Sequence, residues 1–149
     1  MANTPDAPQS FTNHTRFDPM YHYFTVPTSL AFVAWSLVRL VTSPSADTLY
    51  FMIGALALFG AGSVARLSPL RAQDRLIRLE EQLRYARLLP ADLAAEAAEK
   101  FGPRRYVALR FAGDQELEGL VREALRRPEM TGKELKQQIK HWRGDYFRV

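Results

Sequence analysis

The chain has 149 residues, no cysteine and a formal net charge of +4. Without cysteine it has no disulfide, no thiolate metal site and no cysteine nucleophile. Eighteen of its 20 Lys and Arg residues and 13 of its 16 Asp and Glu residues lie from Arg66 onward. The chain therefore divides into an apolar part and a charged part. The charged part has room for one small domain, whose excess of positive charge suits an anionic membrane face.

Residues 1–12 include two prolines and several small polar residues, and we expect a disordered tail there. Next, His14, Asp18 and His22 are spaced by four, which on a helix would offer two imidazoles and a carboxylate to a metal. Pro19 interrupts that face, because proline clashes with the preceding turn. We therefore expect an interfacial segment that holds no metal. A haem is not expected either, since His22 has no facing axial ligand.

Two apolar segments follow, at about residues 24–41 and 48–67. Each approaches the ~20 residues that cross ~30 Å of hydrocarbon. The stretch 42–47 between them allows only a tight turn, so we expect an antiparallel transmembrane hairpin, which with the interfacial segment occupies residues 13–69. A hairpin buried in a soluble domain would need a larger core than the remaining chain provides. A cleaved signal peptide would start with a basic region, and none precedes the first apolar segment.

The arginines predict the orientation of the hairpin. Arg66 and Arg71 follow the second span, Arg16 precedes the first, and the turn has no Lys or Arg. Since basic residues favour the cytoplasmic side, we expect a protein of the cell inner membrane with both termini in the cytoplasm. Arg39, near the outer end of the first span, is expected to snorkel outward or to pair with Asp47. The residues expected at the membrane interface are Tyr21, His22, Tyr23, Arg66 and Arg71.

Small residues recur along one side of the second span. They are Gly54, Ala57, Ala61 and Ala65. In lipid, such residues let two helix backbones approach closely. We expect this stripe at a helix–helix contact, made either with the first span of the same chain or with another chain.

Residues 70–149 are expected to form a cytoplasmic helical domain. From residue 70 to residue 89, leucines recur at helical spacing, as at Leu76, Leu79 and Leu83. Glu80 lies one turn before Arg84, which allows local attraction between them. The helix is expected to be continuous with the second span, or just kinked from it at Pro69, and to end at Pro90.

Four shorter helices are expected after Pro90, at residues 91–101, 104–112, 114–127 and 131–142. Asp114 is expected to cap the third of them. Thr131, with Glu134 three residues later, forms the capping-box pattern at the start of the fourth. Alternating apolar and polar residues, the pattern of a strand, do not occur. The expected fold class is therefore all-α.

The sequence offers little for chemistry. It has no Gly-rich phosphate loop, nucleophile elbow, HExxH motif or paired carboxylates, so we expect no enzyme activity and no cofactor. Acidic residues interrupt the basic ones, so we expect no nucleic-acid partner. Near the C-terminus, Trp142, Tyr146 and Phe147 carry large apolar area. We expect them to dock on the domain itself, on the membrane surface or on a partner.

Four segments carry a resemblance to a known family. They are residues 13–17 (NHTRF), 73–81 (QDRLIRLEE), 109–117 (LRFA, then Asp114, Glu116 and Leu117) and 139–149. Together they resemble a family of bacterial membrane proteins catalogued only as a domain of unknown function. The resemblance implies a bacterial two-span membrane protein, and it brings no activity, cofactor or catalytic residue.

Two functional hypotheses follow. In the first, the protein is a non-enzymatic accessory or scaffold subunit of a larger bacterial membrane complex, and its partners are lipids and other membrane subunits or further copies of itself. In the second, it is a free-standing membrane-surface module whose basic helical domain binds anionic lipid or a soluble protein. We prefer the first.

Overall fold

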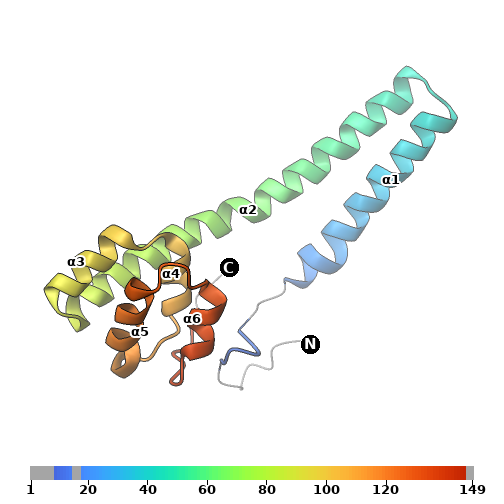
Figure 1. Cartoon of the computed structure of the whole chain (residues 1–149). Coiled ribbons are helices and arrows are strands. Elements are labelled where there is room, and N and C mark those ends of the chain that lie inside the picture. The colour runs from blue at the N-terminus through green and yellow to red at the C-terminus, as the bar shows by residue number, and fades with distance from the viewer. Residues whose placement is uncertain (1–8, 15–17, 147–149) are drawn as a thin grey trace. The chain divides into compact units, whose positions relative to one another are not determined.

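The computed structural model describes residues 9–14 and 18–146, and Figure 1 shows the order of its helices. Every regular element in these residues is helical: a short π-helical segment, η1 (Met20–Thr25), precedes six α-helices. The all-helical prediction is therefore confirmed for the described part of the chain. These residues divide into two compact units, one of residues 18–70 and one of residues 9–14 with 71–146.

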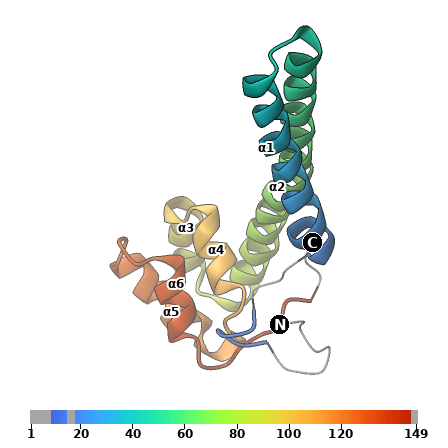
Figure 2. The same cartoon turned by 90° about the vertical axis from the view of Figure 1, so that its right-hand side faces the viewer.

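The first unit contains η1, α1 (Val26–Thr42) and the beginning of α2 (Ala46–Leu88). Pro27 lies in the first turn of α1, where its missing N–H has no helical partner to lose. The tight turn expected after the first apolar segment is present at residues 43–45. Ser45 and Thr48 stabilise it reciprocally, because each backbone N–H donates to the other's hydroxyl oxygen, at 2.9 and 3.1 Å. As a result, α2 runs back alongside α1 (Figures 1 and 2).

The side chains that are buried among the described residues of the first unit are small. Ser36, Thr48 and Ala55 are buried there. At Gly62 the position of an added Cβ would lie 3.6 Å from Thr25 Cγ2. The two helical stretches, Met20–Thr42 and Ala46–Leu88, are both long and apolar enough to cross a membrane.

A single helix, α2, continues for 43 residues and includes Pro69 in its interior. The predicted continuation of the second apolar segment through Pro69 is thus confirmed. The helix ends at Leu88, and Pro90 is the N-cap of α3 (Ala91–Lys100). The predicted stop at Pro90 is also confirmed, because proline cannot donate the backbone bond that would continue the helix.

The second unit adds α4 (Pro103–Leu109), α5 (Asp114–Arg126) and α6 (Gly132–Gln138) to the end of α2 and to α3. The helix α4 contacts both α5 and α6, and α3 contacts α5. Apolar residues from α2, α4, α5 and α6 close one core between them. Its largest fully buried side chains are Tyr85, Tyr106, Leu109, Phe111, Leu117, Val121 and Leu135.

Two helix ends differ from the prediction. The capping box of Thr131 and Glu134 is confirmed, but α6 ends at Gln138 and not near residue 142. The helix ends early because the chain that follows it is bound by Glu116. The Glu116 carboxylate accepts the backbone N–H groups of Lys140 and His141, at 3.1 and 2.9 Å. Trp142, the next residue, pairs with Ala112 in an isolated antiparallel β-bridge.

Asp114 is the first residue of α5 and not its cap. Gly113 is the N-cap and, as a glycine, has no side chain that could make a capping hydrogen bond. The Asp114 carboxylate is bound to Arg84. Similarly, α4 ends at Leu109, three residues before the expected end. The backbone N–H of Ala112 instead donates to Leu109 in a turn, and that of Gly113 donates to the carbonyl oxygen of His141.

The structure differs from the expected disordered tail at residues 9–12. The Gln9 side chain is buried and exchanges two hydrogen bonds with the backbone of Asp145. Ser10 and Asn13 close a turn, in which the Ser10 N–H donates to Asn13 Oδ1 at 2.6 Å. Residues 1–8 lie outside the described residues, and the tail there stays a prediction.

Candidate functional site

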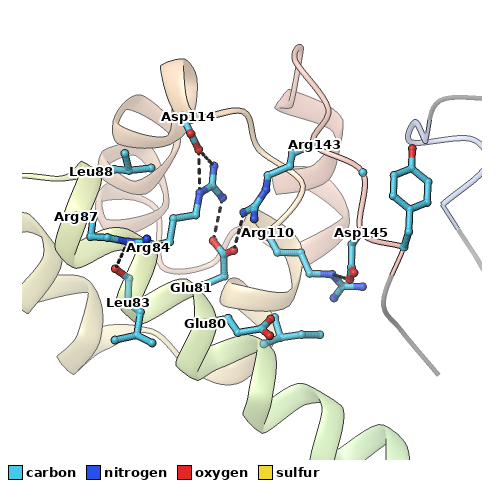
Figure 3. Close-up of a pocket in the computed structure, with 13 residues that line it drawn as sticks. Glu80, Glu81, Leu83, Arg84, Arg87, Leu88, Arg110, Asp114, Arg143 and Asp145 are labelled. Carbon is cyan, nitrogen blue, oxygen red and sulfur yellow. Dashed lines mark hydrogen bonds and ion pairs between the residues drawn. The ribbon is translucent and has the colours of Figure 1, made fainter.

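Arg84 is the centre of a buried charge cluster in the second unit. It lies on the face of α2 that enters the core, and it is only 5% exposed. Its Nη1 donates to Glu81 at 3.0 Å, its Nη2 to the carbonyl oxygen of Ala112 at 2.6 Å, and its Nε and Nη2 both donate to Asp114 Oδ1. Figure 3 shows this guanidinium between the two carboxylates. Because charge-assisted bonds are the strong ones, Arg84 fixes the start of α5 on α2.

Glu81 extends the cluster toward the C-terminal segment. It is 4% exposed and accepts from Arg84 through one oxygen, while its other oxygen lies 3.4 Å from Arg143 Nη1. Burial is the main influence on this carboxyl group and raises its pKa, although Arg84 and Arg143 oppose the shift. Desolvation therefore outweighs the two arginines, as expected for a carboxylate held inside a small core.

A second ion pair holds the next residues of the C-terminal segment. Arg110 Nε lies 2.8 Å from Asp145 Oδ2. The backbone of Asp145 is bound from the other side by Gln9, whose side-chain amide both donates to it and accepts from it, at 3.0 and 2.9 Å. The two described ends of the chain are thus joined to each other and to the end of α4.

These charged groups line a groove of about 700 Å³ in the second unit. Leu83 and Leu88 of α2 form part of its apolar wall. Its charged lining is balanced, with four carboxylates and four guanidiniums: Glu80, Glu81, Asp114, Asp145, Arg84, Arg87, Arg110 and Arg143.

Arginines bind most of the carboxylates of the groove. Three of its carboxylates, Glu81, Asp114 and Asp145, are ion-paired with arginines, whereas a general base needs an oxygen that can reach a substrate proton. Among the described residues that line the groove, Ser, Thr, Cys, His and Lys do not occur. Its charges bind the parts of the domain to one another.

Tyr85 is a buried polar residue next to this cluster. Its hydroxyl has no hydrogen-bond partner in the described part of the chain, and its ring lies 5.4 Å from that of Tyr106. Burial and the nearby Glu81 carboxylate raise the pKa of Tyr85 well above its ordinary value. The phenol therefore stays protonated throughout the physiological range.

The residues expected at the membrane interface lie in both units. Tyr21 and His22 are half-buried in η1, and Tyr23 is exposed. The Arg66 guanidinium carbon lies 5.7 Å from the centre of the Tyr21 ring, a cation–π contact that joins η1 to α2. Arg71, which belongs to the second unit, is exposed.

The two histidines considered as metal ligands belong to different units. His14 lies in the second unit with its ring 5.7 Å from that of Phe111, and its Nε2 lies 3.2 Å from Lys136 Nζ. His22 belongs to the first unit, and its Nδ1 lies 2.8 Å from the carbonyl oxygen of Asp18. Both imidazoles therefore already have protein partners.

The small-residue stripe faces away from α1. Gly54 is half-buried, but Ala57, Ala61 and Ala65 are exposed, whereas the buried small residue of this stretch is Ala55. The contact inside the first unit therefore does not use the three alanines. The stripe was expected to contact either the first span of the same chain or another chain, and its contact with another chain stays a prediction.

The three aromatic residues near the C-terminus differ in their surroundings. Trp142 is half-buried against the core, with its ring 5.0 Å from that of Phe111. Tyr146 is 65% exposed, and its ring lies against Gly144, where a Cβ would be too close to it. Phe147 lies outside the described residues.

Sequence reasoning missed the Arg84 cluster. It paired Arg84 with Glu80, whereas the structure pairs Arg84 with Glu81 and Asp114. A signal was present: Glu81 and Arg84 fall on the same helical face as Ile77 and Tyr85, both apolar or aromatic and both buried. Charged residues on the core-facing side of a helix are seldom buried unless they are paired.

Comparison with known proteins gives one match. The model of a family of unknown function (DUF6526) matches residues 6–149. No curated protein and no solved structure matches the chain.

Proposed function

Since this chain belongs to the family of unknown function DUF6526, we propose from its own geometry that it is a non-enzymatic accessory or scaffold subunit of a larger membrane complex. In this proposal α1 and the first half of α2 cross the inner membrane of a bacterial cell as a hairpin. The remaining helices form a cytoplasmic domain that contacts the other subunits.

One observation carries the membrane part of the proposal: the apolar side chains of both long helices are exposed. In their most apolar stretches only 6% and 11% of the residues are buried. The core helix of a soluble protein would be mostly buried. Water would oppose this exposure at about 25 cal/mol for each Å² of apolar surface, whereas lipid acyl chains cover it without that penalty.

Four hydroxyl groups of the hairpin support the same environment. Thr28, Ser29, Thr42 and Ser63 each donate to a backbone carbonyl one turn earlier, at 2.5 to 2.8 Å. A polar group in hydrocarbon has no water to bind and must find its partner inside the protein. The hydrogen-bond partners of these four side chains therefore lie in the same helical stretch.

The orientation rests on arginine placement. We place the turn at residues 43–45 outside the cytoplasm, because Arg66 and Arg71 follow the second span and the turn is free of Lys and Arg. Arg39 is exposed, and no ion pair joins it to Asp47 among the described residues. We therefore assign Arg39 the snorkelling role, in which its long side chain reaches the outer headgroups.

The accessory role is supported by the charge balance of the domain. The described lining of the main groove has as many carboxylates as guanidiniums, and three of its four arginines, Arg84, Arg110 and Arg143, bind the domain's own acids. Outside the groove, Lys100, Arg122, Arg126 and Arg127 also pair with glutamates of their own or adjoining turns. Each of these pairs leaves one basic group fewer for anionic lipid or a soluble acidic partner. The free-standing module is therefore the less favoured function.

The proposal is tested by isolating the tagged full-length protein from its native membrane in a mild detergent. Membranes of cells grown in heavy isotopes and lacking the tag are mixed in before solubilisation, so that proteins captured after lysis are recognised by their isotope ratio. We expect other membrane proteins at constant stoichiometry and with the light isotope ratio. Recovery of the chain with lipid alone would contradict the accessory role.

A further inference from the structure

We propose that two copies of this chain associate in parallel through a leucine face of α2, formed by Leu76, Leu79, Leu83 and Ala86. The proposal rests on the membrane placement above, because two chains inserted in the same direction present parallel helices. It identifies a second copy of the chain as the first partner of the cytoplasmic domain.

The leucine face is exposed on a helix whose opposite face is already used. Ile77, Glu81 and Tyr85 of α2 are buried in the domain core. Leu76 and Leu79 point the other way and are both 55% exposed, and Leu83, which also lines the groove, is 59% exposed. Three leucines in two turns are more apolar surface than a solvated face of a helix normally carries.

The spacing of these residues is that of a coiled-coil seam. The steps from Leu76 to Leu79, Leu83 and Ala86 are three, four and three residues, and Ala72 precedes Leu76 by four. This places Leu76 and Leu83 at positions a of the heptad, and Ala72, Leu79 and Ala86 at positions d. In such a seam each side chain fits between four residues of a partner helix.

The charges beside the seam favour an identical and parallel partner. Arg75 occupies position g and Glu80 the following position e, which lie opposite each other across a parallel two-stranded coiled coil. Neither forms an ion pair within the described residues, and Glu80 is exposed. In a parallel pair Arg75 of each chain would meet Glu80 of the other. An antiparallel pair would instead bring the two Glu80 carboxylates close together.

Two heptads would be a short seam for free peptides, but here the helix needs no folding on association. It is already formed in each chain and packed against its own domain. Preorganisation removes part of the ordering cost of binding. Confinement of both chains to one membrane supplies a high effective concentration.

The experiment uses the absence of cysteine in the chain. Single cysteines are introduced in the full-length protein at Ala72→Cys, in the seam, and at Asp74→Cys, which is exposed on the opposite side of the same turn. Membranes are treated with a short bis-maleimide. We expect several-fold more cross-linked dimer from A72C than from D74C. Equal yields, or none from A72C, would overturn the proposal.

Direction and charge are tested separately. An antiparallel pair would cross-link A72C to A86C in mixed membranes and leave A72C alone uncross-linked, which would contradict the parallel arrangement. In the A72C background, Glu80→Arg should lower the dimer yield roughly five-fold, because two exposed ion pairs become repulsive. The double change R75E/E80R should restore it. Loss of yield without restoration would show that Arg75 and Glu80 do not face each other.

Alkaline extraction of the same membranes separates this proposal from the one on which it rests. A chain that stays in the membrane pellet but gives no A72C dimer would refute the association alone. A chain released into the supernatant would refute the membrane hairpin, whatever its cross-linking pattern.

Discussion

Arg84 of α2 donates through both Nε and Nη2 to a single oxygen of Asp114, at 3.0 and 2.5 Å, although 30 residues separate the two in sequence. The same guanidinium binds the buried Glu81 and the carbonyl oxygen of Ala112. One side chain therefore neutralises a buried carboxylate and holds the beginning of α5.

The first prediction concerns the loss of that side chain. Arg84→Ala should lower the free energy of unfolding of the second unit by about 3 kcal/mol, because Glu81 and the Ala112 carbonyl would be left buried without this partner. Arg122, whose pair with Glu118 is exposed, is the matched control, and Arg122→Ala should cost about 0.5 kcal/mol or less. Denaturant unfolding of the detergent-solubilised protein measures both. Equal effects would show that the Arg84 cluster is no more important than a surface pair.

The second prediction is a pH dependence. Burial raises the pKa of Glu81 above its ordinary value of 4.5, so the folded chain holds this proton more tightly than the unfolded chain. The contribution of Glu81 to stability is then fully present below pH 4.5 and is lost as pH rises through the raised pKa. Glu81→Gln should remove this loss. The difference in unfolding free energy between the two proteins should therefore change across that window, and a constant difference would exclude the shift.

The third prediction separates two aromatic residues near the C-terminus. Trp142→Ala should destabilise the domain by about 2 kcal/mol, because the indole packs on Phe111 and the core. Tyr146→Ala should change the stability by less than about 0.5 kcal/mol, since that ring is largely exposed. Thermal unfolding in detergent provides the comparison. A larger effect at Tyr146 would show that its ring packs on the domain and would contradict its exposed position.

The fourth prediction distinguishes the two sides of α2 inside the hairpin. Gly62→Leu should disturb the hairpin, because Thr25 lies in the space that the new side chain would enter. Ala61→Leu, on the exposed side, should leave the hairpin intact and weaken contacts with another chain. Native gel electrophoresis and melting in detergent report assembly and stability separately. If Ala61→Leu changes neither, the small-residue stripe makes no helix–helix contact.

Local signals in the sequence predicted much of the fold. The Thr131 capping box, the stop at Pro90 and the turn between the two apolar segments each depend on residues only a few positions apart. Amphipathic spacing likewise indicated the part of α2 that follows Pro69. Physical preferences that act within one or two turns are visible in a single sequence.

The remaining features depend on contacts between distant residues. The early end of α6 follows from Glu116, which binds the backbone more than 20 residues further on. Asp114 was expected as a helix cap, a role that local spacing suggests, but Arg84 competes for its carboxylate. Tertiary contacts of this kind override local preference and leave no periodic trace in the sequence.

The most direct test of the account is the accessibility of single cysteines to a membrane-impermeant maleimide. Ser43→Cys lies in the turn, Gln115→Cys on the exposed surface of α5, and Leu56→Cys among the exposed apolar residues of α2. The account predicts that S43C reacts in intact cells, that Q115C reacts only after lysis, and that L56C reacts in neither case because lipid covers it. Labelling of Q115C in intact cells, or ready labelling of L56C after lysis, would contradict the membrane hairpin with cytoplasmic termini.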